Sequence, residues 1–475
     1  MKSNLLFIIL CPIIIVLSCM GFDFCKESFL KSEFHLLSVH TKQFEQIIEQ
    51  MNSQTSLNEK LKAAIDATHY ATRTKTLYLS SDDIEKVFTT VAEQYDIKLH
   101  AKAIPNSVLH IATELYPTGG HTRVIERWIE NSPEHEINSL LLTRKAFVPE
   151  RLQKAIKERN GQILFLNQNL SDIDRALELR KMASQYEKIV LHIHMDDYLP
   201  LIAFGTNKFP RPVIFFNHAD HRFWIGVSIA DYIVDLREYG KIQTNKYRGS
   251  KRNGIIYLPI DIKSHAQTFN KEENKLAFGL PQDKQIIFSS GAGYKFMPEG
   301  NWDYTIFMEK VLKLKKDVFF VLVGPSPILF KNLVNIPKQN YKFFASMPND
   351  QYLKCLSTAD IVIDSMPMCG FLTLIDAISL NIPVLSLKTK ITQQDFLMHS
   401  KAYVSNMNTL AAQTVEILNS KDKRIKNIAD IKYQLNKTTN PDLYKQEIQN
   451  LYQNIKNHAV HPFKSGKRSF REAVF

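Results

Sequence analysis

The stretch Ala359–Leu387, ADIVIDSMPMCGFLTLIDAISLNIPVLSL, decides the fold of this 475-residue chain. The β-branched run Ile361–Ile363 precedes a loop with Pro and Gly, an amphipathic helix and an apolar run after Pro383. This pattern predicts a βαβ unit whose loop lies at the carboxyl edge of two parallel strands. Beside Gly370, backbone amides, the Thr373 hydroxyl and a helix N-terminus converge, which suits an anionic phosphate. The candidate donor-binding residues of this unit are Gly370, Phe371, Leu372, Thr373 and Asp376.

Short apolar runs alternate with amphipathic helices from Ser107 onward, which predicts parallel sheets covered by helices on both faces. The first series of strands is expected at 108–112, 140–143, 163–166, 189–194, 213–216, 232–236 and 255–258. The second series is expected at 286–290, 318–323, 342–345, 361–364 and 384–387. The fold class is therefore α/β, with two doubly wound, Rossmann-like domains and an N-terminal helical extension. The expected divisions are an apolar segment 1–25, a helical cap 26–105, a first Rossmann-like domain 106–262, a second one 263–430, and a C-terminal helix with a basic tail 431–475.

Composition and charge narrow the functional classes. The chain is 44% hydrophobic and 23% charged, as an ordinary globular protein is. A net charge of +12 favours an anionic partner: a phosphate-bearing ligand, a membrane surface or a nucleic acid. We expect no nucleic-acid partner, because basic and aromatic residues are not interleaved as in RNA-binding proteins. None of the five cysteines forms a CxxC pair, which argues against a metal site or a disulfide framework.

A second candidate loop reads IIFSSGAGYKFMP, from Ile286 to Pro298. Its small residues, among them Ser290 and Gly291, let backbone amides approach a pyrophosphate closely, and Lys295 supplies a countercharge. When a sugar–diphosphate bond breaks, that lysine would stabilise the charge on the leaving group. The alternative is an ordinary βα loop with a solvated lysine.

These two segments, which cover about residues 285–390, resemble the C-terminal donor domain of GT-B glycosyltransferases. The resemblance is closest to the O-GlcNAc transferase-like and bacterial protein N-glucosyltransferase group. The chain departs from the group's pattern at Phe371–Leu372, where a histidine is common. The matching positions are Tyr294, Lys295, Pro298, Ala359, Asp360, Asp364, Ser365, Pro367, Gly370, Thr373, Asp376 and Pro383.

The resemblance implies a nucleotide-sugar donor, expected to be a UDP-sugar, held by the second domain. The acceptor is an unidentified glycan, lipid or protein that faces the first domain. The nucleotide-sugar is a substrate, so no cofactor is expected, and GT-B enzymes do not rely on a metal. Two alternatives remain open, namely a nucleotide-sugar epimerase of the same fold and a non-catalytic nucleotide-sugar-binding protein.

The candidate site residues of the first domain include two histidines and two glycines. Gly119 and Gly120 follow its first strand, where GT-B enzymes bring a glycine-rich loop to the donor, and His121 begins the next helix. His121 is a candidate to bind a substrate hydroxyl or phosphate, and a capping or exposed histidine is the alternative. The stretch 217–221, NHADH, combines imidazoles with a carboxylate that can orient one of them, as a general base requires. We favour His218 as the acceptor-side base over a structural histidine. The candidate catalytic residues are His218, Lys295 and His121.

Two other groups in this half receive weaker interpretations. Strand alternation places His192 and His194 on one face, and core or edge packing is favoured for both. Asp196 and Asp197 form a carboxylate pair, to which we assign no metal.

The apolar segment Leu5–Phe22 follows only Lys2 and contains Pro12. Its length suits a marginal transmembrane helix or the core of a signal peptide, and a mis-assigned start codon is the alternative. A nucleotide donor is cytosolic, so we expect a cytoplasmic protein with membrane association through this segment, its topology left open.

Overall fold

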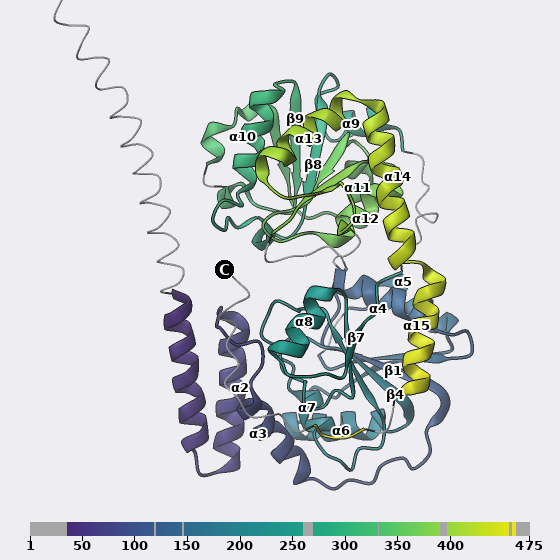
Figure 1. The fold of residues 1–475 in the computed structure, drawn as a ribbon. Coiled ribbons are helices and arrows are strands. Elements are labelled where there is room, and N and C mark those ends of the chain that lie inside the picture. Colours follow the sequence, from purple (N-terminus) through teal and green to yellow (C-terminus); the bar gives the residue numbers. More distant parts are fainter. Residues whose placement is uncertain are drawn as a thin grey trace, which may run out of the picture.

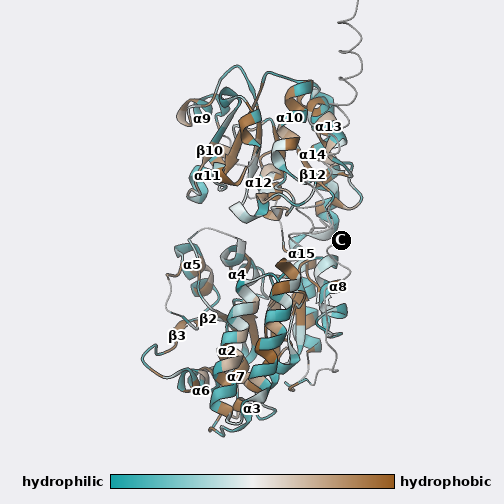
Figure 2. Cartoon of the chain, turned by 90° about the vertical axis from the view of Figure 1, so that its left-hand side faces the viewer, coloured by the Kyte–Doolittle hydropathy of each residue, from teal (hydrophilic) through white to brown (hydrophobic). Residues whose placement is uncertain are grey.

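Two parallel β-sheets organise the chain, one in each half, as Figure 1 shows. The computed structural model describes residues 36–117, 120–144, 147–259, 269–330, 332–389, 397–455 and 458–461. Both sheets carry helices on their two faces, so the predicted pair of doubly wound α/β domains is confirmed. Hydrophobic residues gather on the strands and on the helix faces turned towards them (Figure 2).

The first sheet has the order β3-β2-β1-β4-β5-β6-β7, and all its neighbouring strands are parallel. Its strands are β1 (Ile104–Ala112), β2 (Ile137–Leu142), β3 (Ile163–Phe165), β4 (Tyr186–His192), β5 (Val213–Asn217), β6 (Tyr232–Asp235) and β7 (Asn253–Ile255). Its helices are α4 (Gly120–Glu130), α5 (Glu150–Glu158), α6 (Asp172–Ala183), α7 (Leu199–Phe204) and α8 (Glu238–Lys246).

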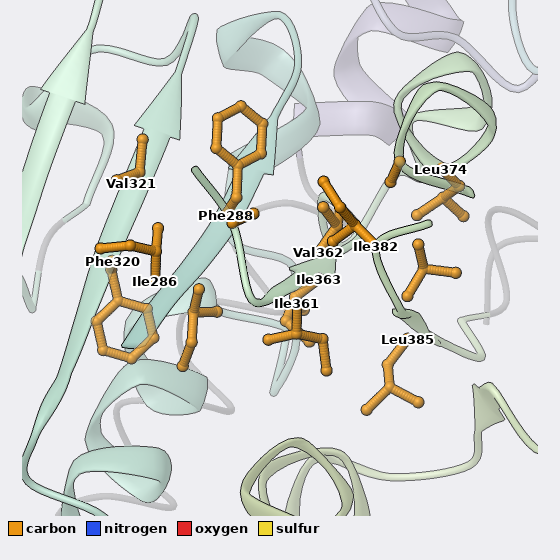
Figure 3. Packing of buried hydrophobic residues seen from close by; sticks show 14 of the residues in the cluster. Ile286, Phe288, Phe320, Val321, Ile361, Val362, Ile363, Leu374, Ile382 and Leu385 are labelled. Carbon is orange, nitrogen blue, oxygen red and sulfur yellow. The ribbon is translucent and has the colours of Figure 1, made fainter. Parts of the chain in front are cut away.

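The second sheet repeats this plan with the order β10-β9-β8-β11-β12-β13, again parallel throughout. Its strands are β8 (Gln285–Ser290), β9 (Val318–Val323), β10 (Tyr341–Phe344), β11 (Ile361–Ile363), β12 (Val384–Leu387) and β13 (Tyr403–Val404). Its helices are α9 (Lys271–Ala277), α10 (Tyr304–Leu314), α11 (Asn349–Leu356), α12 (Phe371–Ser379), α13 (Met407–Asn419) and α14 (Lys421–Thr438), with a 3-10 turn η1 at Gly293–Phe296. Figure 3 shows the β-branched run of β11 packed between Phe288 and Leu385 of its neighbours.

The strand order of each sheet determines which loops lie side by side at its carboxyl edge. In each sheet the chain first builds strands outward on one side and then returns to build the other side, so β1 lies beside β4 and β8 lies beside β11. Loops that follow such a pair of strands diverge and leave a crevice at the carboxyl edge, where open α/β sheets bind their ligands. The loop 291–297 follows β8 and the loop 364–370 follows β11, so the strand order itself brings these segments together.

The N-terminal helices share the core of the first domain. A helix over residues 36–53 pairs with α2 (Leu57–Arg73), and α3 (Asp82–Glu93) follows. The Ser56 hydroxyl accepts from the Glu59 amide, as the capping-box pattern indicates. The buried Arg180 of α6 fastens this extension to the domain by donating to four backbone carbonyls, those of Ala92, Tyr95, Ile202 and Ala203.

The end of the chain returns to the first domain. After α14 the chain enters α15 (Pro441–Asn454), which lies along the first sheet in Figure 1. Tyr444 and Ile448 of α15 pack with Trp128, whose indole N–H donates to the Tyr452 hydroxyl at 2.9 Å. This crossing ties the two domains together at their edge.

Several predicted features lie outside the described residues: the apolar segment 1–25, Gly119, the domain boundary at 262/263 and most of the basic tail. Within the described ranges, no helix is long and apolar enough to cross a membrane. The strand β13 was not predicted, because two residues are too short to show a periodicity.

Candidate functional site

A cavity of about 190 Å³ lies between the two domains. It is bounded by loops that leave the carboxyl ends of strands in both sheets, as expected for a ligand cleft of this architecture. Thr439, at the junction of α14 and α15, closes one side. The first domain contributes Asn217, His218, Asp220, His221, Leu236, Arg237 and Tyr257, and the second contributes Tyr294, Lys295, Met368, Cys369 and Phe371.

Lys295 lies beside the N-terminus of α12. Its ammonium group donates to the Cys369 carbonyl at 3.1 Å, one residue before the N-cap Gly370. Gly291 makes room for this side chain, since a Cβ atom there would lie 3.2 Å from Lys295 Cδ. Among the described residues, Lys295 forms no ion pair with a carboxylate. The structure therefore brings together the loops 291–297 and 364–370, as the sequence predicts. The Lys295 ammonium group places a positive charge at the cavity.

Asp364 shapes the loop that leads into α12. Its carboxylate accepts from the Gly370 amide at 2.6 Å and from the Ser386 hydroxyl at 2.8 Å. Burial raises the pKa of Asp364 to about 6, although both hydrogen bonds favour the ionised form. The N-cap Gly370 carries no side chain that could cap the first turn of α12, and the Thr373 amide of that turn donates to the Gly370 carbonyl at 2.9 Å. The N-terminal end of the α12 dipole therefore points at this part of the cavity.

Three predicted donor-binding residues have protein partners in this structure. The Ser290 and Thr373 hydroxyls lie 2.9 Å apart, and Ser290 also lies 3.2 Å from the Tyr352 hydroxyl. These contacts join the end of β8 to α12. Asp376 forms a two-pronged ion pair with Arg123 of α4, at 3.2 and 3.3 Å. This carboxylate thus lies in the domain interface, with its side chain only 3% exposed.

The other predicted residues of this group lie at the same interface. A Cβ atom on Gly120 would lie 3.1 Å from Leu372 Cδ1, so a glycine here allows the two domains to approach closely. Phe371 packs against the hydrophobic cores of both domains and lines the cavity.

The histidines of the first domain form a cluster. His121 Nε2 donates to the His192 carbonyl at 2.9 Å, which leaves Nδ1 as the acceptor nitrogen, without a partner among the described residues. The His121 ring lies 4.6 Å from the His218 ring, centroid to centroid. Burial lowers the pKa of His121 to about 4 and that of His218 well below its usual value. Both rings are therefore neutral at pH 7.

His192 and His194, at the end of β4, lie in different environments. His192 is fully buried with its Nε2 3.0 Å from Nδ1 of His110, whereas His194 stacks on Tyr116 at a centroid distance of 5.9 Å. Asp197 accepts from two buried threonine hydroxyls, both at 2.6 Å. Among the described residues, no group of three or more metal-ligating side chains comes together.

The carboxylate of the NHADH stretch contacts His221 and not His218, the histidine that the sequence favoured as the base. Asp220 accepts from Arg237 Nε at 2.6 Å and Nη2 at 2.8 Å, and its Oδ1 lies 3.2 Å from His221 Nδ1. Burial alone would raise the pKa of Asp220, but the Arg237 guanidinium brings it below its usual range. Asp220 therefore stays ionised.

Two arginines of the site were missed by the sequence analysis. Arg237 is the second residue after β6, at the carboxyl edge, and its Nη1 lies 3.9 Å from the Cys369 sulfur of the other domain. Arg123 lies in the first turn of α4, two residues after His121. Arg237 could have been predicted as a site residue, because it follows a strand at the carboxyl edge of the sheet. Arg123 could not, because its partner Asp376 is 253 residues away and the local sequence gives no sign of the pair.

No protein-family model matches the sequence, and no curated protein matches it. Solved structures do match. The HepE protein of Anabaena, in complex with UDP and glucose, aligns over 73% of this chain and 99% of its own, with 12% identity and a TM-score of 0.56. A glycosyltransferase from Rickettsia africae aligns over 74% and 99%, with 12% identity and the same TM-score. An O-GlcNAc transferase mutant from Thermobaculum terrenum aligns over 88% and 82%, with 13% identity and a TM-score of 0.53.

At such low identity these matches establish the fold. They confirm the resemblance expected from the loops at Lys295 and Gly370, and the two parallel sheets agree with it. The chain has the fold of GT-B glycosyltransferases.

Proposed function

We propose that this protein transfers a sugar from a UDP-sugar donor to an acceptor in the cavity between its domains. The observation that carries the proposal is the position of Lys295. Its ammonium group lies at the N-terminus of α12, in the crevice that the strand order of the second sheet creates. A cation beside the positive end of a helix dipole suits a diphosphate.

The proposed chemistry follows from these charges. When the bond between the sugar and the diphosphate breaks, negative charge collects on the departing phosphate oxygen. Lys295 and the N-terminal dipole of α12 would stabilise that charge more strongly than they stabilise the intact donor, and such a difference lowers the barrier. Because the cavity lies between two domains, a bound donor would be shielded from water there.

The acceptor would approach from the first domain, whose loops form the opposite wall of the cavity. His218 lines that wall, with His121 packed against it. Both are neutral imidazoles, so they can accept or donate hydrogen bonds to a hydroxyl without bringing a positive charge to the acceptor side.

The choice of uridine and of a hexose rests on the solved structures. HepE has been crystallised with UDP and with UDP-glucose, and a nucleotide of this kind fits the cation and helix N-terminus described above. These structures indicate a donor and no acceptor, so the acceptor class must be identified by experiment.

A thermal-shift panel with UDP, GDP, ADP and CDP tests the proposal. A nucleotide at 100 times its Kd stabilises the folded state by about 2.7 kcal/mol, and we expect UDP to raise the Tm most. K295M should weaken UDP binding at least about tenfold, because one charge-assisted contact of roughly 1.5–3 kcal/mol is lost. The exposed Lys313 of α10 provides the control variant, K313M. Absence of stabilisation by every nucleotide, or unchanged UDP binding by K295M, would overturn the proposal.

Product analysis separates transfer from epimerisation. A transferase releases UDP from the donor, whereas an epimerase returns a UDP-sugar of altered configuration without any release. We expect free UDP.

A further inference from the structure

The histidine best placed to act as a base in the cavity is His221. It lies on the cavity wall formed by the loop after β5, and 24% of its side chain is exposed. His221 Nδ1 lies 3.2 Å from Asp220 Oδ1. It is thus the histidine of the NHADH stretch that has a carboxylate partner.

The contact with Asp220 determines which nitrogen of His221 carries the proton. Asp220 is ionised, because Arg237 binds both of its oxygens, and an ionised carboxylate can only accept hydrogen bonds. His221 Nδ1 must therefore be the donor. In the neutral ring this leaves Nε2 with a free electron pair, the form in which an imidazole accepts a proton.

The charged groups around this pair hold it in place. Arg237, two residues after β6, binds Asp220 from one side, and the buried Arg248 donates to the Asp220 carbonyl at 3.1 Å from another. The other titratable groups near this pair are His218, whose protonation His221 disfavours, and Asp235 and Tyr239, which interact electrostatically with Asp220. Asp220 and Arg237 are thus positioning residues for the His221 ring.

The other histidines meet the requirements of a base less well. An effective general base accepts a proton near the operating pH. Burial makes the His218 ring hard to protonate, and within the described part of the chain neither His218 nor His121 has a carboxylate that would stabilise the imidazolium. A carboxylate beside an imidazole supplies that stabilisation.

We propose that His221 Nε2 accepts the proton of the acceptor hydroxyl during sugar transfer, an inference that rests on the proposed function. As the acceptor oxygen forms its bond to the anomeric carbon, its proton passes to His221. The bond from the anomeric carbon to the phosphate oxygen breaks, and its electron pair stays on the diphosphate beside Lys295. Asp220 stabilises the resulting imidazolium.

The test uses the full chain and follows UDP release from UDP-glucose, UDP-N-acetylglucosamine and UDP-galactose, with water as the acceptor. We expect H221Q to lower kcat about 10²- to 10³-fold, the usual share of a general base, while its Kd for UDP stays within about twofold of wild type. The exposed His135 provides the matched control, and H135Q should keep wild-type kcat.

Chemical rescue separates a base from a structural residue. H221G should regain at least about tenfold activity when imidazole is added, and the rescued rate should follow the neutral fraction of that imidazole as pH changes. A merely structural role would show no such dependence.

Three outcomes would overturn the inference: H221Q with more than about a tenth of wild-type kcat, no rescue of H221G, or a wild-type protein that binds UDP but turns over none of the three donors. Loss of UDP binding by the wild-type protein would instead refute the proposed function. The two failures are therefore distinguishable.

Discussion

The ion pair between Arg123 and Asp376 offers a sharp prediction about how the two domains are held together. Asp376 in α12 is 3% exposed and Arg123 in α4 is 20% exposed, so the two partners differ in their access to water. We therefore expect the two single substitutions to have unequal effects. R123M leaves a buried carboxylate without its main countercharge, whereas D376N leaves an arginine that can still turn towards solvent.

The magnitude follows from the geometry. For charges about 4 Å apart at an effective dielectric constant of about 20, the attraction is about 4 kcal/mol. Arg127, one turn along α4, also attracts Asp376 and would recover part of this energy. We expect R123M to lower the free energy of unfolding by about 3 kcal/mol, the lower end of the range for breaking a buried pair. D376N should lower it by about 1 kcal/mol, the usual net contribution of a hydrogen bond.

Urea unfolding followed by tryptophan fluorescence measures these energies in a double-mutant cycle. Trp128 and Trp224 report on the first domain and Trp302 on the second, so a loss of coupling between domains would also appear as a split transition. The control is the exposed pair Lys154–Glu158 of α5, with K154M and E158Q, for which a coupling of about 0.3–0.5 kcal/mol is typical.

For Arg123 and Asp376 we expect a coupling energy of about 2 kcal/mol. A coupling below about 0.5 kcal/mol, no larger than that of the exposed pair, would refute the reasoning. Equal losses in R123M and D376N would refute it too, because the argument depends on their unequal burial.

Two further predictions concern buried polar groups. Burial raises the pKa of Asp235 to about 7, so between about pH 4 and pH 7 the folded state holds a proton that the unfolded chain releases. For Asp235 alone, stability should fall by on the order of 4 kcal/mol as pH rises through this window, whereas the buried His121 and His218, which are neutral in the folded state, raise it. The expected result in urea unfolding is therefore a difference between variants: between about pH 4 and pH 7, D235N should gain on the order of 4 kcal/mol relative to the exposed-site control D283N. Y452F leaves the buried indole N–H of Trp128 without its acceptor and should lower the free energy of unfolding by about 1–3 kcal/mol; an unchanged urea midpoint would contradict it.

Much of the fold could be predicted because it is encoded locally. Apolar runs such as 318–323 and 384–387 coincide with the strands β9 and β12, and the loops at Lys295 and Gly370 follow their strands as expected. Alternation of strands and helices leaves few arrangements other than a parallel sheet, and parallel strands bring their carboxyl ends to one edge. The sequence alone thus predicts that Lys295 lies near α12, as the structure shows.

The partners of the charged residues could not be predicted in this way. The sequence left open which histidine Asp220 would orient, and in the structure His221 and Arg237 contact it. Asp376 was expected at the donor, yet it pairs with Arg123. The strength of a charge pair depends on the distance between the charges and on their burial in the folded molecule. Spacing along the chain gives neither quantity.

By itself, then, the amino-acid sequence determined the two parallel sheets and the edge at which their loops gather, because strand periodicity and βα alternation are local properties. Only the tertiary structure decided which histidine has a carboxylate partner and which carboxylate faces the other domain. The Asp220–His221 contact depends on how the loop after β5 folds against Arg237, and the Arg123–Asp376 contact forms only when the two domains dock, which depends on shape and desolvation across hundreds of residues.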